Sequence, residues 1–211
     1  MKEVILVGGG GFCKSVADVV ENAGYNIMGI LDKPEEVGKK LLRYEVIGTD
    51  DDIPSFVGKA EFVITVGHIK NSLIRQKIYD RIKMANGTIA TIVAKDAYVS
   101  PYAKIGEGCL IMHKAMVGAE VELGVCTIIN TLCNISHEAK IGSFCHISTC
   151  ASVNGACVIP NDTFIGSQSV INQGIKLSID GCVIASLSVV NKDITEKGVY
   201  AGSPAKLIRQ L

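Results

Sequence analysis

Tryptophan is absent from the 211-residue sequence, aromatic residues make up only 5% of it, and proline occurs five times. An excess of either charge is also missing, because 21 acidic residues balance 21 basic residues. This balance gives no support for a nucleic-acid-binding protein, which usually carries a basic surface. The sequence shows no uncharged apolar run of 18 residues and no signal-peptide pattern, so we expect neither a membrane partner nor export.

Cysteine, in contrast, occurs eight times. In a small secreted chain this number would suggest a disulfide framework. Here Cys109, Cys133, Cys145 and Cys157 occupy a fixed position in a repeat, which favours a packing role. We therefore expect thiols and a reducing, cytoplasmic compartment.

The repeat is an aliphatic residue at every sixth position through the second half of the chain. This period matches neither the 3.6-residue period of a helix nor the two-residue period of a strand, and it is typical of a hexapeptide β-solenoid. Known solenoids of this kind wind left-handed, although the sequence itself does not reveal the hand. The repeat positions are Val93, Val99, Ile105, Ile111, Val117, Leu123, Ile129, Ile135, Ile141, Ile147, Val153, Ile159, Ile165, Ile171, Leu177, Val183 and Val189.

The residue two places before each aliphatic position should also point inward, since side chains alternate along a strand. These residues are nearly all small, and four of them are the cysteines named above. A triangular cross-section has room for one large and one small residue on each side. Three hexapeptides then complete a coil, and residues 93 to about 194 form between five and six coils.

The first ninety residues lack this period and alternate between strand and helix patterns. Strands are expected at residues 2–7, 26–31 and 61–66, and helices at residues 15–22 and 72–85. This order predicts a parallel, Rossmann-like α/β domain over residues 1–90. The left-handed β-helix, with a C-terminal tail, then occupies residues 91–211.

Three features of the first domain fall at the carboxyl ends of its strands, where open α/β sheets bind ligands. The glycine loop at residues 8–12 could approach a phosphate, Asp32 could accept hydrogen bonds from a ribose or a base, and Gly67 leaves space. The dinucleotide fingerprint is poor, because Cys13 or Lys14 replaces its third glycine in the two possible registers. A tight turn without a ligand is the alternative.

Proton-transfer chemistry in the solenoid points to histidine, whose side chain can take a proton near neutral pH. Three of the four histidines lie there, namely His113, His137 and His146. His113 has no carboxylate close in sequence, which favours a solvated side chain. His137 lies at a turn and is followed by Glu138, which could hold the imidazole or raise its basicity, although spacing alone leaves a functional and a solvated role equally balanced.

We name the sides of the predicted prism A, B and C after Ile135, Ile141 and Ile147, respectively. His137 then lies on the A/B edge, whereas His146 projects from side C. One chain cannot bring these two histidines together, but neighbouring prisms packed side by side in a trimer could.

Small residues are expected to leave room near these histidines. Gly155 lies one coil from His137 and has no side chain to obstruct it. Ser167 and Ala185, which are 18 residues apart, are expected to stack on the C/A edge. A long thin ligand could lie along the track that they leave.

Three segments resemble a known family: INTLCNISHEAKIGSFCHIS at residues 129–148, VYAGSPAK at 199–206 and VGGGGF at 7–12. They look like the hexapeptide-repeat acyltransferases that include bacterial nucleotide-sugar N-acetyltransferases and sialic acid O-acetyltransferases. The resemblance covers nearly the whole chain. It implies an acetyl-CoA-dependent N-acetyltransferase in bacterial glycan biosynthesis, acting on a UDP-4-amino-4,6-dideoxy sugar or a similar nucleotide sugar. It also implies a homotrimer with intersubunit active sites and no metal.

The resemblance also implies residue roles. The general base falls on His137, and the acid that increases its basicity falls on Glu138. Acetyl-CoA binding falls on His146, Gly155, Ser167 and Ala185. Nucleotide-sugar binding falls on Gly10, Gly11, Phe12, Asp32, Lys33 and Gly67. Two positions depart from the family pattern, because Phe12 stands where histidine is common and Lys33 stands where a second acid is expected.

The implied mechanism is direct transfer. His137 takes the proton of an acceptor amine as the amine attacks the thioester carbonyl, Glu138 stabilises the imidazolium, and backbone amides of a neighbouring turn hold the oxyanion. A sugar O-acetyltransferase of the sialic acid type is an alternative, because the same residues serve a hydroxyl acceptor. A non-catalytic nucleotide-binding solenoid is a further alternative, which the His137 and Glu138 pair disfavours.

Overall fold

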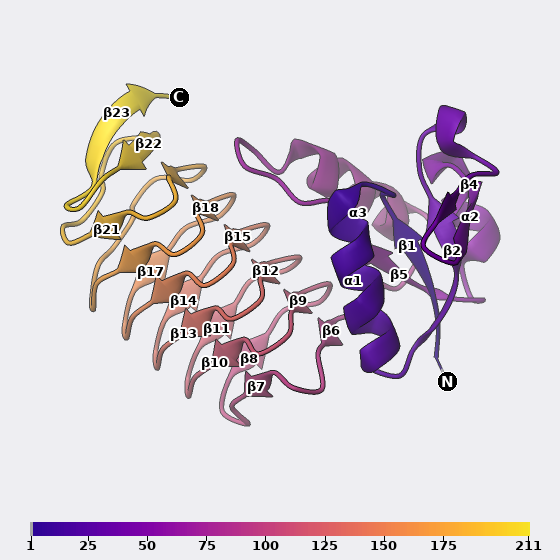
Figure 1. The fold of residues 1–211 in the computed structure, drawn as a ribbon, viewed down its shortest axis with the longest axis horizontal. Coiled ribbons are helices and arrows are strands. Elements are labelled where there is room, and N and C mark those ends of the chain that lie inside the picture. The colour runs from indigo at the N-terminus through magenta and orange to yellow at the C-terminus, as the bar shows by residue number, and fades with distance from the viewer. Residues whose placement is uncertain (1) are drawn as a thin grey trace. The chain divides into compact units, whose positions relative to one another are not determined.

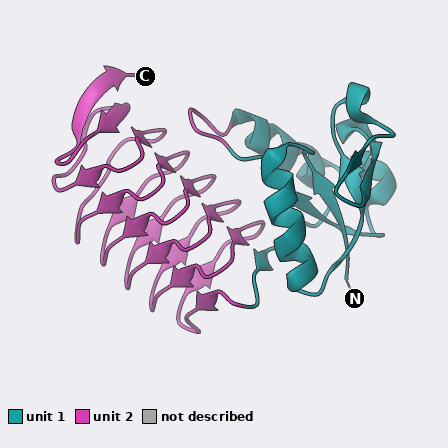
Figure 2. Cartoon of the chain, viewed as in Figure 1, with its two compact units in different colours: residues 1–67, 73–95 teal, residues 68–72, 96–211 magenta. Residues whose placement is uncertain are grey.

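The computed structural model describes residues 2–211 and divides the chain into two compact units (Figure 2). Unit 1 comprises residues 1–67 and 73–95, and unit 2 comprises residues 68–72 and 96–211. The short segment 68–72 therefore groups with the solenoid, although it is surrounded in sequence by the α/β domain. No feature of the hydrophobic period signals this excursion.

Unit 1 contains a parallel sheet, as its alternation of strand and helix patterns predicts. The strand order is β3-β4-β2-β1-β5, and only the β3–β4 pair is antiparallel. The strands are β1 (Glu3–Val7), β2 (Asn26–Leu31), β3 (Lys40–Leu41), β4 (Tyr44–Gly48) and β5 (Glu61–Ile64), with β6 (Ile92–Val93) near the end of the unit. The helices are α1 (Gly11–Asn22), α2 (Ile53–Phe56) and α3 (Leu73–Met84), with short 3-10 turns η1 (Pro34–Glu36) and η2 (Asp50–Asp52).

Burial explains why the strands of unit 1 read as continuous apolar runs. In β1 the residues Val4, Ile5, Leu6 and Val7 are completely buried, as expected when both faces of a parallel sheet are covered. Helix α1 contributes a buried stripe that includes Val16, Val19 and Val20, at the spacing of one helical face. Within residues 2–211 no helix is long and apolar enough to cross a membrane.

Unit 2 is a β-helix in which short parallel strands stack on three sides (Figure 1), and the C-terminal strand adds to one side in the antiparallel direction. Side A carries β7 (Tyr98–Val99), β10 (Met116–Val117), β13 (Asn134–Ile135), β16 (Ser152–Val153), β19 (Val170–Ile171) and β21 (Val189–Val190). Side B carries β8 (Lys104–Ile105), β11 (Glu122–Leu123), β14 (Lys140–Ile141) and β17 (Val158–Ile159). Side C carries β9 (Leu110–Ile111), β12 (Ile128–Ile129), β15 (His146–Ile147), β18 (Phe164–Ile165), β20 (Val183–Ile184), β22 (Gly198–Ala201) and β23 (Lys206–Gln210).

The corners of the prism are turns that each need one residue with a positive φ. From Gly108 to Gly174 such a residue occurs at every sixth position, and ten of these twelve positions are not glycine. Glu138 is one of them, with φ of 61°. A left-handed backbone is unfavourable for these side chains, so the stacking of complete coils must impose it. This repeated corner geometry accounts for the six-residue spacing of the turns.

The expected register is wrong after Leu177. Ile165 pairs with Ile184, a separation of 19 residues, instead of with Val183. The interval between positive-φ corners also lengthens there, because Gly174 is followed by Gly181. One extra residue in the turn before Cys182 is responsible. The axial side chains of the last coil are therefore Ile184 and Val190, exposed by 0% and 2%, rather than Val183 and Val189.

The small inward residues do more than fill space. The hydroxyl of Thr127 donates a hydrogen bond to the carbonyl of Gly142 at 2.7 Å, and the thiol of Cys145 donates to the carbonyl of Pro160 at 3.0 Å. Cys109 and Cys157 make similar contacts with turn carbonyls. Cysteine, threonine and serine are therefore useful in the small inward position because each supplies a donor to a buried carbonyl.

Candidate active site

The His137 and Glu138 pair lies on the A/B edge, in the turn between β13 and β14. Nδ1 of His137 is 3.0 Å from Oε2 of Glu138, and both side chains are 58% exposed. A carboxylate can only accept, so His137 donates its Nδ1 proton to Glu138. This hydrogen bond leaves Nε2 as the nitrogen with a lone pair for a substrate proton.

The absence of a side chain at Gly155 allows the His137 ring to adopt its observed position. A β-carbon on Gly155 would lie 2.5 Å from Cε1 and 2.7 Å from Nε2 of His137, too close for any side chain. The coils are also joined here, because the amide of Ala156 donates to the carbonyl of His137 at 2.9 Å. The structure thus brings together two of the sequence-predicted residues on one edge, and Gly155 flanks the basic nitrogen.

His146 projects outward from side C but is buried, with 8% of its surface exposed. Its Nδ1 donates to the carbonyl oxygen of His68 at 2.9 Å, and its ring meets the Phe164 ring edge-on at 5.4 Å between centroids. The same His68–Ser72 segment is held at its other end, where the amide of Ser72 donates to Asp162 at 2.7 Å. Sequence spacing does not reveal that this segment covers the histidine expected to contact acetyl-CoA.

The two residues expected to stack on the C/A edge do not share a register. The extra residue in the last coil aligns Ala185 with Gly166, whose amide donates to the carbonyl of Ile184. Ser186 becomes the coil neighbour of Ser167. The hydroxyl of Ser167 itself lies 2.9 Å from the hydroxyl of Ser148, one coil away on the same edge. Ser167 and Ala185 therefore lie near each other on this edge without stacking directly.

A second candidate site is a pocket of about 490 Å³ within unit 1. It lies at the carboxyl ends of β1, β2 and β4, and it includes three of the expected nucleotide-sugar residues, Gly10, Asp32 and Lys33. Gly11, Phe12 and Gly67 do not line the pocket, but each is close in sequence to a residue that does. The amide of Gly9 donates to Oδ2 of Asp32 at 3.0 Å, which fixes the carboxylate against the glycine loop.

The pocket also contains residues that the sequence did not point out. They are Pro34, Thr49, Asp50, Asp51, Val66, Ile74, Ile78 and Arg81, and they join Gly8 and Gly9 of the predicted glycine loop. The run of three aspartates at 50–52 was a visible signal, but it becomes meaningful only when β4 is known to be a neighbour of β2. Helix α1 begins beside the pocket, and its N-cap residue Gly10 provides no side-chain cap. Its first amide groups can therefore serve an anionic ligand.

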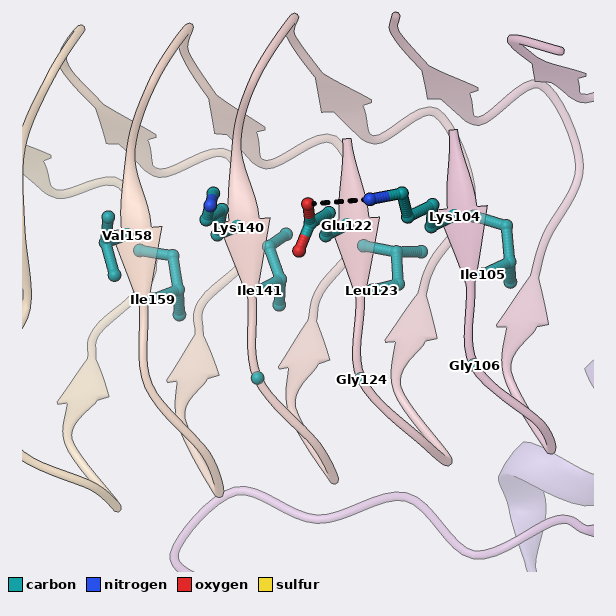
Figure 3. A pocket seen from close by; sticks show the side chains of 11 residues that line it. Lys104, Ile105, Gly106, Glu122, Leu123, Gly124, Lys140, Ile141, Val158 and Ile159 are labelled. Atoms are coloured by element: carbon teal, nitrogen blue, oxygen red, sulfur yellow. Dashed lines mark hydrogen bonds and ion pairs between the residues drawn. The ribbon is translucent and has the colours of Figure 1, made fainter. Parts of the chain in front are cut away.

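Two hollows on side B contrast with these sites. The larger, of about 520 Å³, lies over the outer surface of β8, β11, β14 and β17 (Figure 3). Its row of outward side chains begins with Lys104, Glu122 and Lys140, and the first two form an ion pair at 3.4 Å. The smaller, of about 320 Å³, is lined by Glu138. The larger hollow is lined by neither His137 nor Glu138, so we assign it no chemical role.

Other chemistry finds little support in unit 2. Burial raises the pKa of the Cys133 thiol to about 12, which keeps it protonated and makes it a poor nucleophile at neutral pH. His113 forms a 2.7 Å contact with Asp96 that its sequence neighbours did not suggest. Across residues 2–211 no group of three or more His, Cys, Asp or Glu side chains is arranged to hold a metal ion.

Comparisons with known proteins agree with this architecture. The family model described as the PglD N-terminal domain matches residues 3–82. The acetyltransferase domain of PglB from Neisseria gonorrhoeae FA1090 is 27% identical, with a TM-score of 0.91 over 99% of this chain and 100% of that chain. Its complex with acetyl coenzyme A is 28% identical, with the same TM-score over 98% and 99% of the two chains.

Two further matches were found. A mutant perosamine N-acetyltransferase from Caulobacter crescentus, in complex with CoA and GDP-perosamine, shares the fold at 20% identity, with a TM-score of 0.72 over 98% of this chain and 97% of that chain. Uncharacterized protein L142 of Acanthamoeba polyphaga mimivirus is 32% identical over 126 residues, or 60% of this chain, which spans about a quarter (24%) of that protein's length. Residues 3–82 thus match the PglD N-terminal domain, and nearly the whole chain shares the fold of the PglB acetyltransferase domain, a left-handed β-helix preceded by an α/β domain.

Proposed function

We propose that the protein is an acetyl-CoA-dependent N-acetyltransferase that acts on the amino group of a nucleotide-activated amino-deoxy sugar. The UDP-4-amino-4,6-dideoxy sugars are the acceptors that we expect. The observation that carries this proposal is the 3.0 Å hydrogen bond between His137 and Glu138 on an exposed edge of the solenoid. The likeness to PglB, whose structure contains acetyl coenzyme A, supports the choice of donor.

The chain's own residues supply base catalysis in this proposal. Glu138 keeps the Nδ1 proton of His137 in place, so that Nε2 accepts the proton of the acceptor amine as the new amide bond forms. Because Gly155 has no side chain, the imidazole ring can occupy its present position, from which Nε2 can meet an acceptor. Acetyl-CoA contributes the activated acetyl group. After transfer, the imidazolium is stabilised by the carboxylate that already contacts it.

The pocket of unit 1 supports a nucleotide on the acceptor. The start of α1, at the end of the glycine loop, has no side-chain cap and can offer backbone amides to a diphosphate. Asp32, at the end of the adjacent strand, offers a carboxylate to a ribose or a base. We propose that Gly10, Asp32 and Lys33 contact the nucleotide sugar directly, with Gly11, Phe12 and Gly67 beside them.

We also propose a homotrimer, based on the three different sides of the prism. Outward side chains on side C from β9 to β20 are at most 8% exposed within this chain, and those of side B include the charged row of Figure 3. Side A is uncharged and open. Its outward residues are Tyr98, Met116, Asn134, Ser152, Val170 and Val189. Subunit interfaces are depleted in charge at their centres, so side A is the surface that best suits a second copy.

A trimer built on side A would complete the acetyl-donor site. Side A is bounded by the A/B edge, which carries His137, and by the C/A edge, which carries Ser167. Cyclic packing on side A brings the A/B edge of each copy towards the C/A edge of the next. We therefore propose that His137 and Gly155 of one subunit face Ser167 and Ala185 of its neighbour.

Measurement of CoA release with 4-amino sugars linked to UDP, GDP and dTDP tests the function. We expect turnover with at least one of these acceptors, and we expect His137→Ala to lower turnover by roughly a hundredfold or more. His113→Ala is the matched control, because it removes another solenoid histidine away from the proposed site. Equal activity of the His137→Ala variant and the unchanged protein would reject the assignment of the base.

A further inference from the structure

The turn after β4 carries three consecutive aspartates with three different surroundings. Oδ2 of Asp52 turns back and accepts a hydrogen bond from the amide of Thr49 at 2.7 Å. Oδ1 of Asp51 lies 2.8 Å from Nη1 of Arg81. Asp50 lines the pocket of unit 1, and within residues 2–211 its carboxyl group has no hydrogen-bond or ion-pair partner. Two of the three aspartates thus have structural partners, whereas Asp50 faces the pocket alone.

The burial of Asp50 is unfavourable for the fold by itself. Desolvation raises the pKa of the Asp50 carboxyl above its ordinary value, the charge of Arg81 opposes this shift, and the charges of Asp32 and Asp51 add to it. A half-buried carboxylate without a hydrogen-bond donor lowers stability at neutral pH. Such a residue is expected where a ligand supplies the missing donor.

The order of the strands indicates which part of a nucleotide Asp50 would meet. Strands β1, β2 and β4 are adjacent and parallel, and Leu31 at the end of β2 pairs with Gly48 at the end of β4. Neighbouring strands lie about 4.8 Å apart, so the pocket extends roughly 10 Å from the glycine loop to the end of β4. With the diphosphate at the glycine loop and Asp32 at the next strand, Asp50 lies at the position of the base.

We propose that Asp50 reads the base of the nucleotide sugar by accepting a hydrogen bond from a ring N–H. This inference rests on the proposed function. It also accounts for Lys33, because the carboxylate missing from that position is supplied from the neighbouring strand. The proposal adds Asp50 to the residues that determine specificity.

The chemistry of a carboxylate predicts the class of base. An ionised carboxylate only accepts hydrogen bonds. Uracil, thymine and guanine present a ring N–H on their pairing edge, whereas cytosine and adenine present a ring nitrogen with a lone pair at the equivalent place. Asp50 therefore favours the first group and repels the second. The nucleotide is one that carries a lactam N–H.

Titration calorimetry with UDP, GDP, CDP and ADP tests this inference. We expect the unchanged protein to bind UDP or GDP at least tenfold more tightly than CDP and ADP. In Asp50→Asn this preference should fall to a fewfold, because the amide can donate as well as accept. Glu45→Gln is the matched control, since it converts an exposed carboxylate on β4, the strand that precedes Asp50, to an amide outside the pocket, and it should preserve the preference.

Thermal unfolding of the same variants separates recognition from a structural role. If Asp50 serves a ligand, Asp50→Asn should raise the melting temperature of the ligand-free protein at pH 7. A lowered melting temperature, or an unchanged base preference in Asp50→Asn, would overturn the role of Asp50 and leave acetyl transfer intact. Absence of binding of all four nucleotides to the unchanged protein would overturn both this role and the nucleotide-linked acceptor.

Discussion

Gly155 and the imidazole of His137 are so close that no side chain could replace the glycine hydrogen without moving the ring. Gly155→Ala should therefore turn the His137 ring away from its present position. We expect turnover to fall at least tenfold, since small displacements of a catalytic base are costly. The melting temperature should change little, because the ring is exposed and can rotate. Steady-state kinetics and thermal unfolding check this prediction, and unchanged kinetics would contradict it.

Glu138→Gln tests whether the negative charge beside His137 matters. Glutamine retains an oxygen acceptor for the Nδ1 proton but does not stabilise the imidazolium by charge. We expect turnover to fall by roughly tenfold to a hundredfold, less than the loss caused by His137→Ala. Glu120→Gln, on the same edge one coil away, controls for a general effect of removing surface charge. An equal response of both variants would show that the hydrogen-bonded pair has no special role.

The proposed subunit interface can be tested with two variants, each of which introduces one lysine on a different side of the prism. Ser152→Lys places a lysine in the middle of side A, whereas Val158→Lys places one in the same coil on side B. We expect only Ser152→Lys to give monomers by size-exclusion chromatography with light scattering, because burial of an unpaired charge is unfavourable. Its activity should be lost with the trimer. A trimeric Ser152→Lys protein would exclude side A as the interface.

His146 offers a prediction about a segment rather than about catalysis. In His146→Ala the His68–Ser72 segment loses a hydrogen bond and the ring contact beside Phe164. We expect a loss of about 1–3 kcal/mol in the free energy of unfolding and faster amide hydrogen exchange in this segment. The measurement uses the ligand-free protein. Unchanged exchange would show that His146 does not hold the segment and would leave only its proposed contact with acetyl-CoA.

The raised pKa of Asp50 predicts how stability depends on pH. The folded state binds the Asp50 proton more tightly than the unfolded state, so the destabilising contribution grows as pH rises through the folded pKa. The gain in melting temperature of Asp50→Asn should therefore be full at pH 7 and should vanish below about pH 4, where the carboxyl is protonated in both states. A gain that is independent of pH would contradict this cause.

The solenoid was largely predictable because its signal repeats. The axial residues from Val117 to Ile171 pair with the residue 18 positions earlier in the chain. A wrong assignment of one residue therefore does not shift the predicted position of the next. The extra residue before Cys182 broke this logic, since Val183 and Ile184 are both aliphatic and either could continue the period. Only the backbone pairing decides between them.

The candidate sites were predictable to different degrees. The contact of His137 with Glu138 follows from their adjacency at a turn, whereas the burial of His146 depends on a segment 78 residues earlier in the chain. The proposed role of Asp50 depends on the position of β4. Residues 33–60 have no strong hydrophobic period, so the sequence did not predict this strand. Non-local contacts of this kind leave no pattern in a single sequence.

The eighteen-residue coil also determines which changes of length the solenoid can absorb. Removal of one complete turn of the spiral would leave every later residue on its original side, so the column would be shorter but its surfaces would keep their identity. Removal of only six residues would rotate all later residues by one third of a revolution, and His137 would then point from a different corner if the deletion preceded it. Changes of length within the regular coils before His137 should therefore come in multiples of eighteen residues, whereas a single corner turn can absorb an extra residue, as the turn before Cys182 does.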